Sequence, residues 1–196
     1  MNSIEVMNLA LASLGNTRTI SSVGDQSTEA TLCGRFYDMV RQSLLKLYPW
    51  GFATVMTDLT VTTETHDKYE YVYEYPEDCL RVLSVYVPGD TTSADYVVYS
   101  VDGDVQKVRR IATDVEDARI SYVYDVQDCD TMPAEFVDAL ALSLASRLAL
   151  PLASDGRMAQ AIGQQATIAI DTAKRMCALE QKTELVTTNK YSQARR

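Results

Sequence analysis

Three carboxylates close together in the sequence are the first residues that could do chemistry. Asp125, Asp128 and Asp130 lie three and two positions apart, and oxygen ligands at such short spacings can bridge a divalent ion. The spacing differs from that of an EF-hand loop, which also needs a glycine turn and a closing glutamate. We therefore favour a solvated loop that precedes a helix, and keep a metal-dependent hydrolase as a remote alternative.

The only histidine gives little support for acid–base or nucleophilic catalysis. His66 lies in the polar segment 63–68, and a Ser-His-Asp arrangement would have to use it. The sequence contains no nucleophile elbow, no Walker A motif and no Gly-x-Gly-x-x-Gly motif. We interpret His66 as an exposed loop residue, and the sequence predicts a protein that is not an enzyme and has no cofactor.

The four cysteines are too widely separated to form a zinc site. No Cys-x-x-Cys pair occurs, and a single histidine cannot complete a ligand set. The sequence therefore predicts no metal site and four reduced, mostly buried thiols. They are Cys33, Cys79, Cys129 and Cys177.

The acidic charge argues against broad binding to nucleic acid. The net charge is −9 and the pI is about 4.6, whereas DNA-binding proteins use Lys and Arg to neutralise phosphates. The tyrosines that alternate through residues 69–75 could stack on bases. Few basic residues interleave with them, so packing within a sheet is favoured.

Length and composition indicate a globular protein. A chain of 196 residues with 46% hydrophobic residues suits one large domain or two small ones with a sizeable core. The most apolar stretch, residues 136–153, is interrupted by Asp138 and Arg147, so we expect no membrane span. The N-terminus has no basic region typical of a signal peptide, and we expect synthesis in the cytoplasm.

Helical periodicity opens the chain. Residues 3–14 read as a helix, with Ser3 as a candidate N-cap and Gly15 as its stop. Residues 28–48 read as a second helix, capped by Ser27 or Asp25 and ended by Pro49. Its expected apolar stripe comprises Leu32, Phe36, Met39, Val40, Leu44 and Leu47.

The middle of the chain changes to the period of strands. Asp102-Gly103 is a typical hairpin signal with a type I′ turn. Five or six antiparallel strands are expected in total. They are residues 52–62, 69–75, 80–87, 96–101, 105–111 and 118–126.

Helices return near residue 132. Residues 132–150 should form a buried helix with Asp130 or Thr131 as cap, Pro133 in its first turn and Pro151 as its end. Residues 154–185 read as one long helix. Its expected apolar face comprises Met158, Ile162, Ala166, Ala169, Ala173, Met176 and Leu179.

These patterns predict an α+β fold made of a helical bundle and a β-rich insertion. Residues 1–50 and 131–185 supply the bundle, residues 51–130 form the insertion, and residues 186–196 form a flexible polar tail. Lys190, Arg195 and Arg196 make this tail basic, so it is a candidate surface for a partner.

Arginines within apolar or strand segments are the remaining candidates for contacts. Arg147 interrupts an otherwise apolar helix and is either at the edge of the bundle or paired across a subunit interface. Pairing with Asp138 inside one chain is excluded, because nine residues place the two about two and a half turns apart. The sequence assigns no specific role to Arg41, Arg109 and Arg110.

Three passages in a fixed order carry a resemblance to a known family. They are Tyr48-Pro49-Trp50-Gly51-Phe52-Ala53, the strand start Tyr75–Val82 and the Ala/Leu helix Phe136–Leu148. Together with the order of elements over residues 1–185, they resemble the tail tubular protein A family, the head-to-tail adaptors of short-tailed phages. The matching positions look like landmarks of the fold without catalytic roles. They are Pro49, Trp50, Pro76, Asp78, Cys79 and Arg81.

The resemblance implies a structural protein in the neck of a virion tail. It implies a ring of about twelve copies, bound to the portal on one side and to a tail nozzle protein on the other, with DNA passing through the lumen. An acidic wall would let DNA pass without holding it; apart from the resemblance, we favour the interpretation that the negative charge aids solubility. The alternative is another connector or head-completion protein at a different axial position. The tyrosine-rich β region departs from better-known members, so the identity of the tail protein below stays open.

Overall fold

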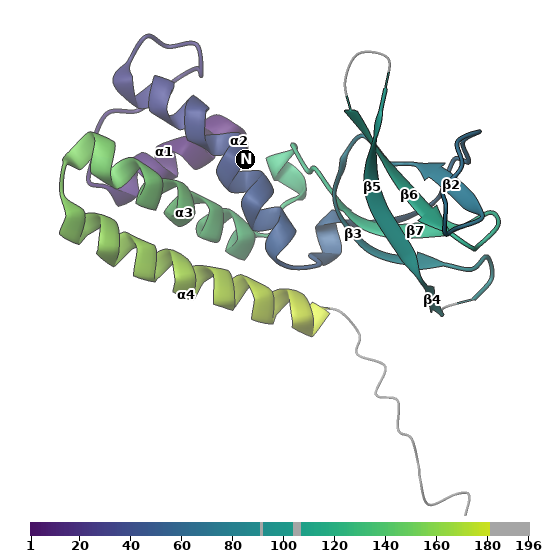
Figure 1. Cartoon of the computed structure of the whole chain (residues 1–196). Helices are drawn as coiled ribbons and strands as arrows, with labels where there is room; N and C mark the ends of the chain where they lie inside the picture. The colour runs from purple at the N-terminus through teal and green to yellow at the C-terminus, as the bar shows by residue number, and fades with distance from the viewer. Residues whose placement is uncertain (91, 104–106, 181–196) are drawn as a thin grey trace, which may run out of the picture.

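The computed structural model describes residues 1–90, 92–103 and 107–180, and it has the predicted α+β fold. Figure 1 shows the helices gathered at one end of the molecule and the sheets at the other. The chain forms two helices, then all the strands, then two more helices. The strands therefore interrupt a helical unit whose two halves come together from the ends of the described chain.

The two N-terminal helices begin at side-chain caps. Helix α1, Ser3–Ser13, is capped by Asn2, which forms a reciprocal capping box with Glu5. The prediction of Ser3 as the cap was wrong, because the Asn2 carboxamide one position earlier accepts the Glu5 N–H. Gly15 follows the helix with a φ of 71°, a backbone conformation that favours glycine.

Helix α2, Thr28–Leu47, is capped by Ser27 as predicted. Asp25 instead accepts hydrogen bonds from the backbone of Ser21 and Ser22 in the preceding loop.

The buried face of α2 is rotated from the predicted stripe. Met39 and Leu47 are about half exposed, so their assignment to the core was wrong. The buried positions include residues that the apolar count passed over, because a cysteine, a tyrosine and an arginine share the inward side. They are Glu29, Ala30, Cys33, Tyr37, Arg41 and Leu45, whereas Val40 and Leu44 belong to the predicted stripe and are buried as expected.

Helix α3, Ala134–Ala153, begins without the predicted side-chain cap. Asp130 and Thr131 lie in a short 3-10 turn, Cys129–Thr131, and Pro133 occupies the cap position. Pro151 does not end the helix, which continues for two more residues. A proline near a C-terminus removes only one helical N–H, and the left-handed Ser154, φ 51°, ends the helix instead.

Helix α4, Gly156–Glu180, packs along α3 (Figure 1). Its predicted small-residue face is buried at Ile162, Ala166, Ala169 and Ala173. The face continues to Cys177, four residues after Ala173, whereas Met176 and Leu179 lie off this face and are exposed. Residues 181–185 of the predicted helix lie outside the described residues.

Helix α3 also has the length and composition of a membrane-spanning helix. Its mean hydropathy is 1.5, and 50% of the most apolar window is buried inside the protein. The absence of a membrane span stays a prediction, because this result rests on length and composition alone. The core helix of a water-soluble protein passes the same test.

Seven strands lie between the helical halves. A 3-10 turn, Gly51–Ala53, precedes the first strand where the sequence predicted strand from residue 52. The two-residue strand β4 was not predicted. The strands are β1 Thr54–Asp58, β2 Tyr71–Glu74, β3 Cys79–Tyr86, β4 Ser93–Ala94, β5 Tyr96–Asp102, β6 Lys107–Thr113 and β7 Arg119–Tyr124.

The strands form two antiparallel sheets, with orders β1-β7-β3-β4 and β2-β6-β5 (Figure 1). Asp102 pairs with Lys107 across β5 and β6, so four residues connect these strands. The prediction of a two-residue turn at Asp102-Gly103 was therefore wrong. Between the sheets, Tyr73 is 1% exposed and its hydroxyl donates to the Val115 carbonyl at 2.7 Å, which confirms sheet packing at this tyrosine.

An aromatic cluster sits where the chain leaves the bundle for the strands. Trp50 is 1% exposed, and its Nε1 donates to the Leu44 carbonyl at 3.0 Å. The Trp50 and Phe136 ring centroids are 5.0 Å apart, and those of Phe52 and Phe136 are 4.9 Å apart. This edge-to-face packing joins the end of α2, the 3-10 turn before β1 and the first turn of α3.

We expect Trp50→Ala to lower the free energy of unfolding by about 3–5 kcal/mol, because it removes a fully buried indole and leaves a cavity. Leu179→Ala is the matched control, since Leu179 is 79% exposed and its truncation should change stability by less than about 0.5 kcal/mol. Denaturant unfolding measures both. Equal stability of Trp50→Ala and wild type would contradict the packing described.

Candidate subunit interface

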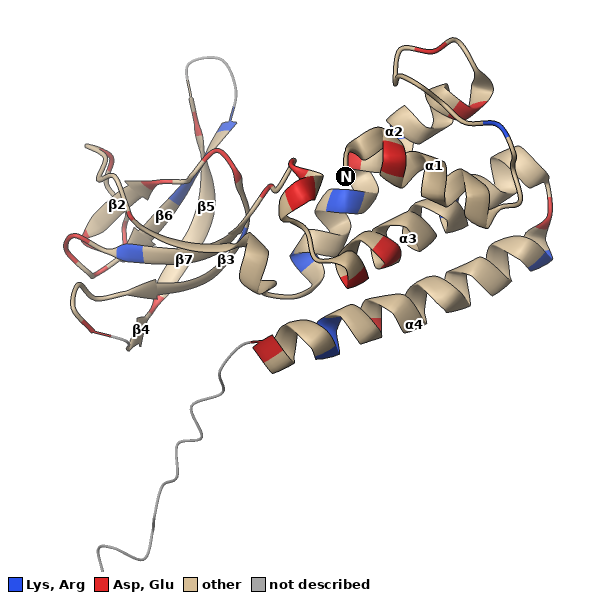
Figure 2. Cartoon of the chain, turned by 180° about the vertical axis from the view of Figure 1, so that it is seen from behind, with Lys and Arg blue, Asp and Glu red and all other residues tan. Residues whose placement is uncertain are grey.

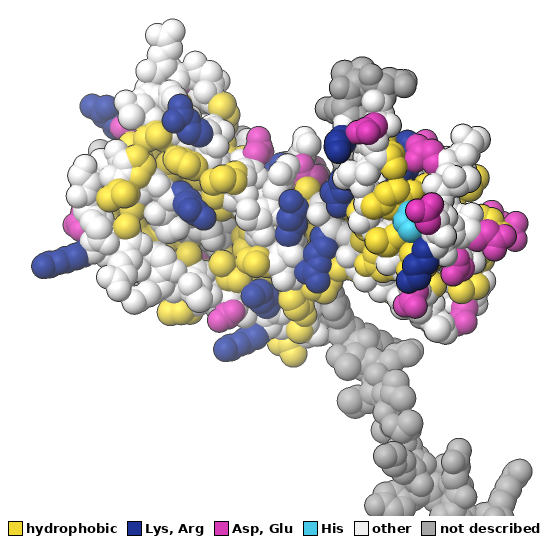
Figure 3. All heavy atoms as spheres, viewed as in Figure 1, with side chains coloured by type: hydrophobic (Ala, Val, Ile, Leu, Met, Phe, Trp, Pro, Cys, Tyr) yellow, Lys and Arg dark blue, Asp and Glu magenta, His cyan; other side chains and the backbone are white. Residues whose placement is uncertain are grey.

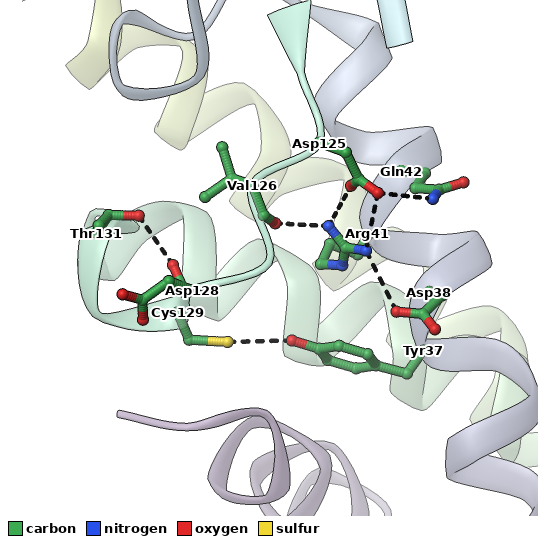
Figure 4. Close-up of polar contacts among 9 residues, drawn as sticks. All are labelled: Tyr37, Asp38, Arg41, Gln42, Asp125, Val126, Asp128, Cys129 and Thr131. Carbon is green, nitrogen blue, oxygen red and sulfur yellow. Dashed lines mark hydrogen bonds and ion pairs between the residues drawn. The ribbon is translucent and has the colours of Figure 1, made fainter. Parts of the chain in front are cut away.

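A buried arginine network holds the strand region to α2 (Figure 4). The Arg41 side chain is 3% exposed and donates to the Asp125 carboxylate, the Val126 carbonyl and the Asp38 carboxylate. Gln42 donates a further hydrogen bond to Asp125 at 2.9 Å. Burial alone lowers the pKa of Arg41, but the hydrogen bond and charge of Asp125 outweigh it and hold the pKa above its ordinary value.

The three carboxylates of the predicted acidic loop have separate partners. The interpretation of Asp125 as solvated was wrong, because its side chain is 14% exposed and paired with Arg41. Asp128 accepts from the Asp130 backbone N–H at 2.9 Å, and Asp130 pairs with the N-terminal amine of Met1. Among the described residues, no three His, Cys, Asp or Glu side chains form a group that could hold a metal ion.

The landmark residues before β3 form a turn and its anchors. The Pro76 carbonyl accepts from the Cys79 N–H at 3.0 Å. The Asp78 carboxylate accepts from the Tyr122 hydroxyl at 3.0 Å, and its carbonyl accepts from the Asp125 N–H at 2.8 Å. Asp78 therefore positions the chain next to the carboxylate that binds Arg41.

The other landmarks act at the C-terminus of α2. Tyr48 is the C-cap of this helix, and Pro49 follows it. From β3, the Arg81 guanidinium donates to the Lys46 carbonyl at 2.9 Å, which satisfies one of the carbonyls left free at the helix end.

All four cysteines are reduced and buried, as predicted. Burial raises the pKa of the Cys33 thiol to about 11, and it also raises the pKa of Cys79. His66 is half-buried against Tyr99, with ring centroids 4.8 Å apart. The prediction of an exposed histidine was therefore wrong, because the loop folds back onto β5.

The negative charge of the chain is confined to its middle. Residues 51–130 contain 17 of the 27 acidic residues but 6 of the 18 basic ones, whereas the rest of the chain has a net charge of +2. Figure 2 shows acidic positions spread along the loops and strand ends of this region. The total charge of −9 does not reveal this segregation, which appears only when the charges of residues 51–130 are counted separately.

A groove with an arginine lies between α2, α3 and α4. It has a volume of about 310 Å³ and is lined by Met39, Leu47, Arg147, Gly163 and Ile170, among others. Met39 is 47% exposed and Leu47 is 54% exposed. Arg147 is exposed and makes no ion pair or hydrogen bond within the described part of the chain.

A second groove, with two carboxylates, lies between α3 and α4. It has a volume of about 320 Å³ and is lined by Glu135, Asp138, Leu142, Ile168 and Thr172, among others. Ile168 is 67% exposed. Neither Glu135 nor Asp138 makes an ion pair with any described residue.

The helical half thus carries exposed apolar side chains with charges among them. In the view of Figure 3, hydrophobic side chains gather over the helical bundle and basic side chains lie between them. A mixture of exposed apolar surface and arginine is typical of protein–protein interfaces. The remaining interface candidates from the sequence, Lys190, Arg195 and Arg196, lie outside the described residues.

No protein-family model matches this chain, and the search of curated proteins found no match.

We expect Arg41→Met to destabilise the fold by about 3–5 kcal/mol, because the Asp125 carboxylate loses its buried partner. The double variant Arg41→Met, Asp125→Leu should recover most of this loss, since no buried charge remains. Asp38→Ala is the control, because Asp38 is 73% exposed and should contribute less than about 1 kcal/mol. Thermal and denaturant unfolding check these values. An Arg41→Met variant as stable as the control would show that the network does not join the two regions.

Proposed function

We propose that this protein is a structural component of a virion, the head-to-tail adaptor of a short-tailed phage. In this proposal about twelve copies form a ring between the portal and the tail nozzle, and DNA passes through the lumen. The protein would be made in the host cytoplasm and act in the neck of the tail, without a catalytic site or a cofactor. The resemblance of residues 1–185 to the tail tubular protein A family supports this proposal.

The observation that carries the proposal is the pair of unfilled grooves along α3 and α4. One has exposed Met39 and Leu47 and the other exposed Ile168, and their charged groups have no ion-pair partner among the described residues. A subunit of a closed ring needs two such surfaces, because it contacts one neighbour on each side. Contacts with two neighbours would bury these exposed side chains.

The charge distribution supports a passive role towards DNA. Residues 51–130 have a net charge of −11, so this region repels the phosphate backbone. If it faced the lumen, DNA would slide past without being retained. The grooves and the acidic region would also suit a connector at another axial position. The proteins that bind this chain distinguish the adaptor from such a connector.

Assembly with the portal is the most direct test of this function. Twelve copies of the 21.8 kDa chain amount to about 262 kDa, so light scattering after size exclusion should detect this mass added to the portal. Negative-stain images should show a ring on the portal face that points to the tail. Binding at another position would favour the alternative connector. Small oligomers that do not bind the portal would contradict both the adaptor and the connector.

We also expect weak binding to duplex DNA. At physiological salt the dissociation constant should be about 10⁻⁴ M or weaker, because few phosphates can be neutralised. Fluorescence anisotropy with a labelled duplex measures this value, and a basic DNA-binding protein serves as the positive control. Binding at nanomolar protein would contradict a passive conduit and would favour the tyrosines of residues 69–75 as a platform for bases.

A further inference from the structure

The two grooves beside α3 and α4 lie on opposite sides of this helix pair. Asp138 and Arg147 are nine residues apart on α3, which is about two and a half turns, so they project in opposite directions. On α4, Gly163 lines one groove and Ile168 lines the other. One neighbouring molecule therefore cannot cover both grooves at once.

The chemistry of the two grooves is complementary. The groove with Arg147 contains exposed apolar side chains and no carboxylate among its lining residues. The groove with Glu135 and Asp138 contains exposed Ile168 and no basic residue among its lining residues. Charges of opposite sign beside matching apolar surface favour contact between unlike grooves, whereas like grooves would bring like charges together.

We infer that neighbouring subunits join by a head-to-tail contact in which the carboxylate groove of one copy packs on the arginine groove of the next. Asp138 of one subunit pairs with Arg147 of its neighbour, and Ile168 packs against Met39 and Leu47. This inference rests on the proposed ring and adds its contact surfaces. Contacts between unlike surfaces generate a ring when the rotation closes, and they leave each copy with one partner per groove.

Charge exchange between two variants tests this contact. Arg147→Asp and Asp138→Arg each place like charges at every interface, so each variant alone should need at least about ten-fold more protein to assemble than wild type. Mixing the two should restore assembly, because alternating subunits then present opposite charges at every contact. Arg157→Asp is the control, since Arg157 is exposed and lines neither groove.

Light scattering of the full-length proteins, alone and with portal, gives the assembly state. Recovery in the mixture, at a one-to-one ratio of the variants, is the expected result. Assembly of both single variants at wild-type concentrations would overturn the contact and leave the ring intact. Wild-type protein that forms no ring under either condition would overturn the proposed function and the contact together.

Crosslinking gives a second measurement that does not depend on charge. Met39→Cys combined with Ile168→Cys, treated with a short bis-maleimide, should produce a ladder of oligomers up to the full ring. Each single variant should remain uncrosslinked. The four native thiols are buried and should react slowly. Wild-type protein treated with the same bis-maleimide is the control for this reaction. A dimer from either single variant would indicate contact between like grooves. Crosslinks confined to one chain would indicate that residues 39 and 168 react within a single subunit, and both outcomes overturn the inference.

Discussion

The buried guanidinium of Arg41 is the constraint on which the rest of the structure depends. A charge that is 3% exposed requires a carboxylate at bonding distance, and the chain supplies Asp125 from the segment that follows β7. The strands must therefore return to α2 at one position. Since α3 begins nine residues after Asp125, the same contact limits where that helix lies, and Trp50 packs on its first turn at Phe136. The sides on which Asp138 and Arg147 emerge follow from this placement.

The order and type of the elements could be predicted from the sequence, because hydrophobic period is a local property. The face of α2 could not, since the apolar count placed Met39 and Leu47 inside while Arg41 and Tyr37 share the buried side. The pair of Arg41 and Asp125 joins residues 84 positions apart, and no local pattern reveals it. Pro151 was misjudged for a simpler reason: a proline near the end of a helix removes one hydrogen bond and need not stop it.

The candidate site was predicted in part. Arg147 was recognised because a charge interrupts an apolar helix, and the structure places it in a groove with exposed Met39 and Leu47. The opposite groove was missed, since two carboxylates near the start of a helix are ordinary in any sequence. Only the packing of α4 against α3 brings Glu135 and Asp138 into one groove with Ile168. The segregation of charge into residues 51–130 complements this arrangement: helices with apolar grooves suit contacts between subunits, and an acidic β region suits a surface that DNA passes.

A reconstruction of the virion neck at side-chain resolution tests the proposed ring and its contact between unlike grooves most directly. We expect a ring of this chain between portal and nozzle, with each α3–α4 pair between two neighbours. The Arg147 guanidinium of every copy should lie within about 4 Å of the Asp138 carboxylate of the next, the distance of an ion pair. A neck without this chain, a monomeric attachment, or a ring in which both grooves face solvent would contradict it.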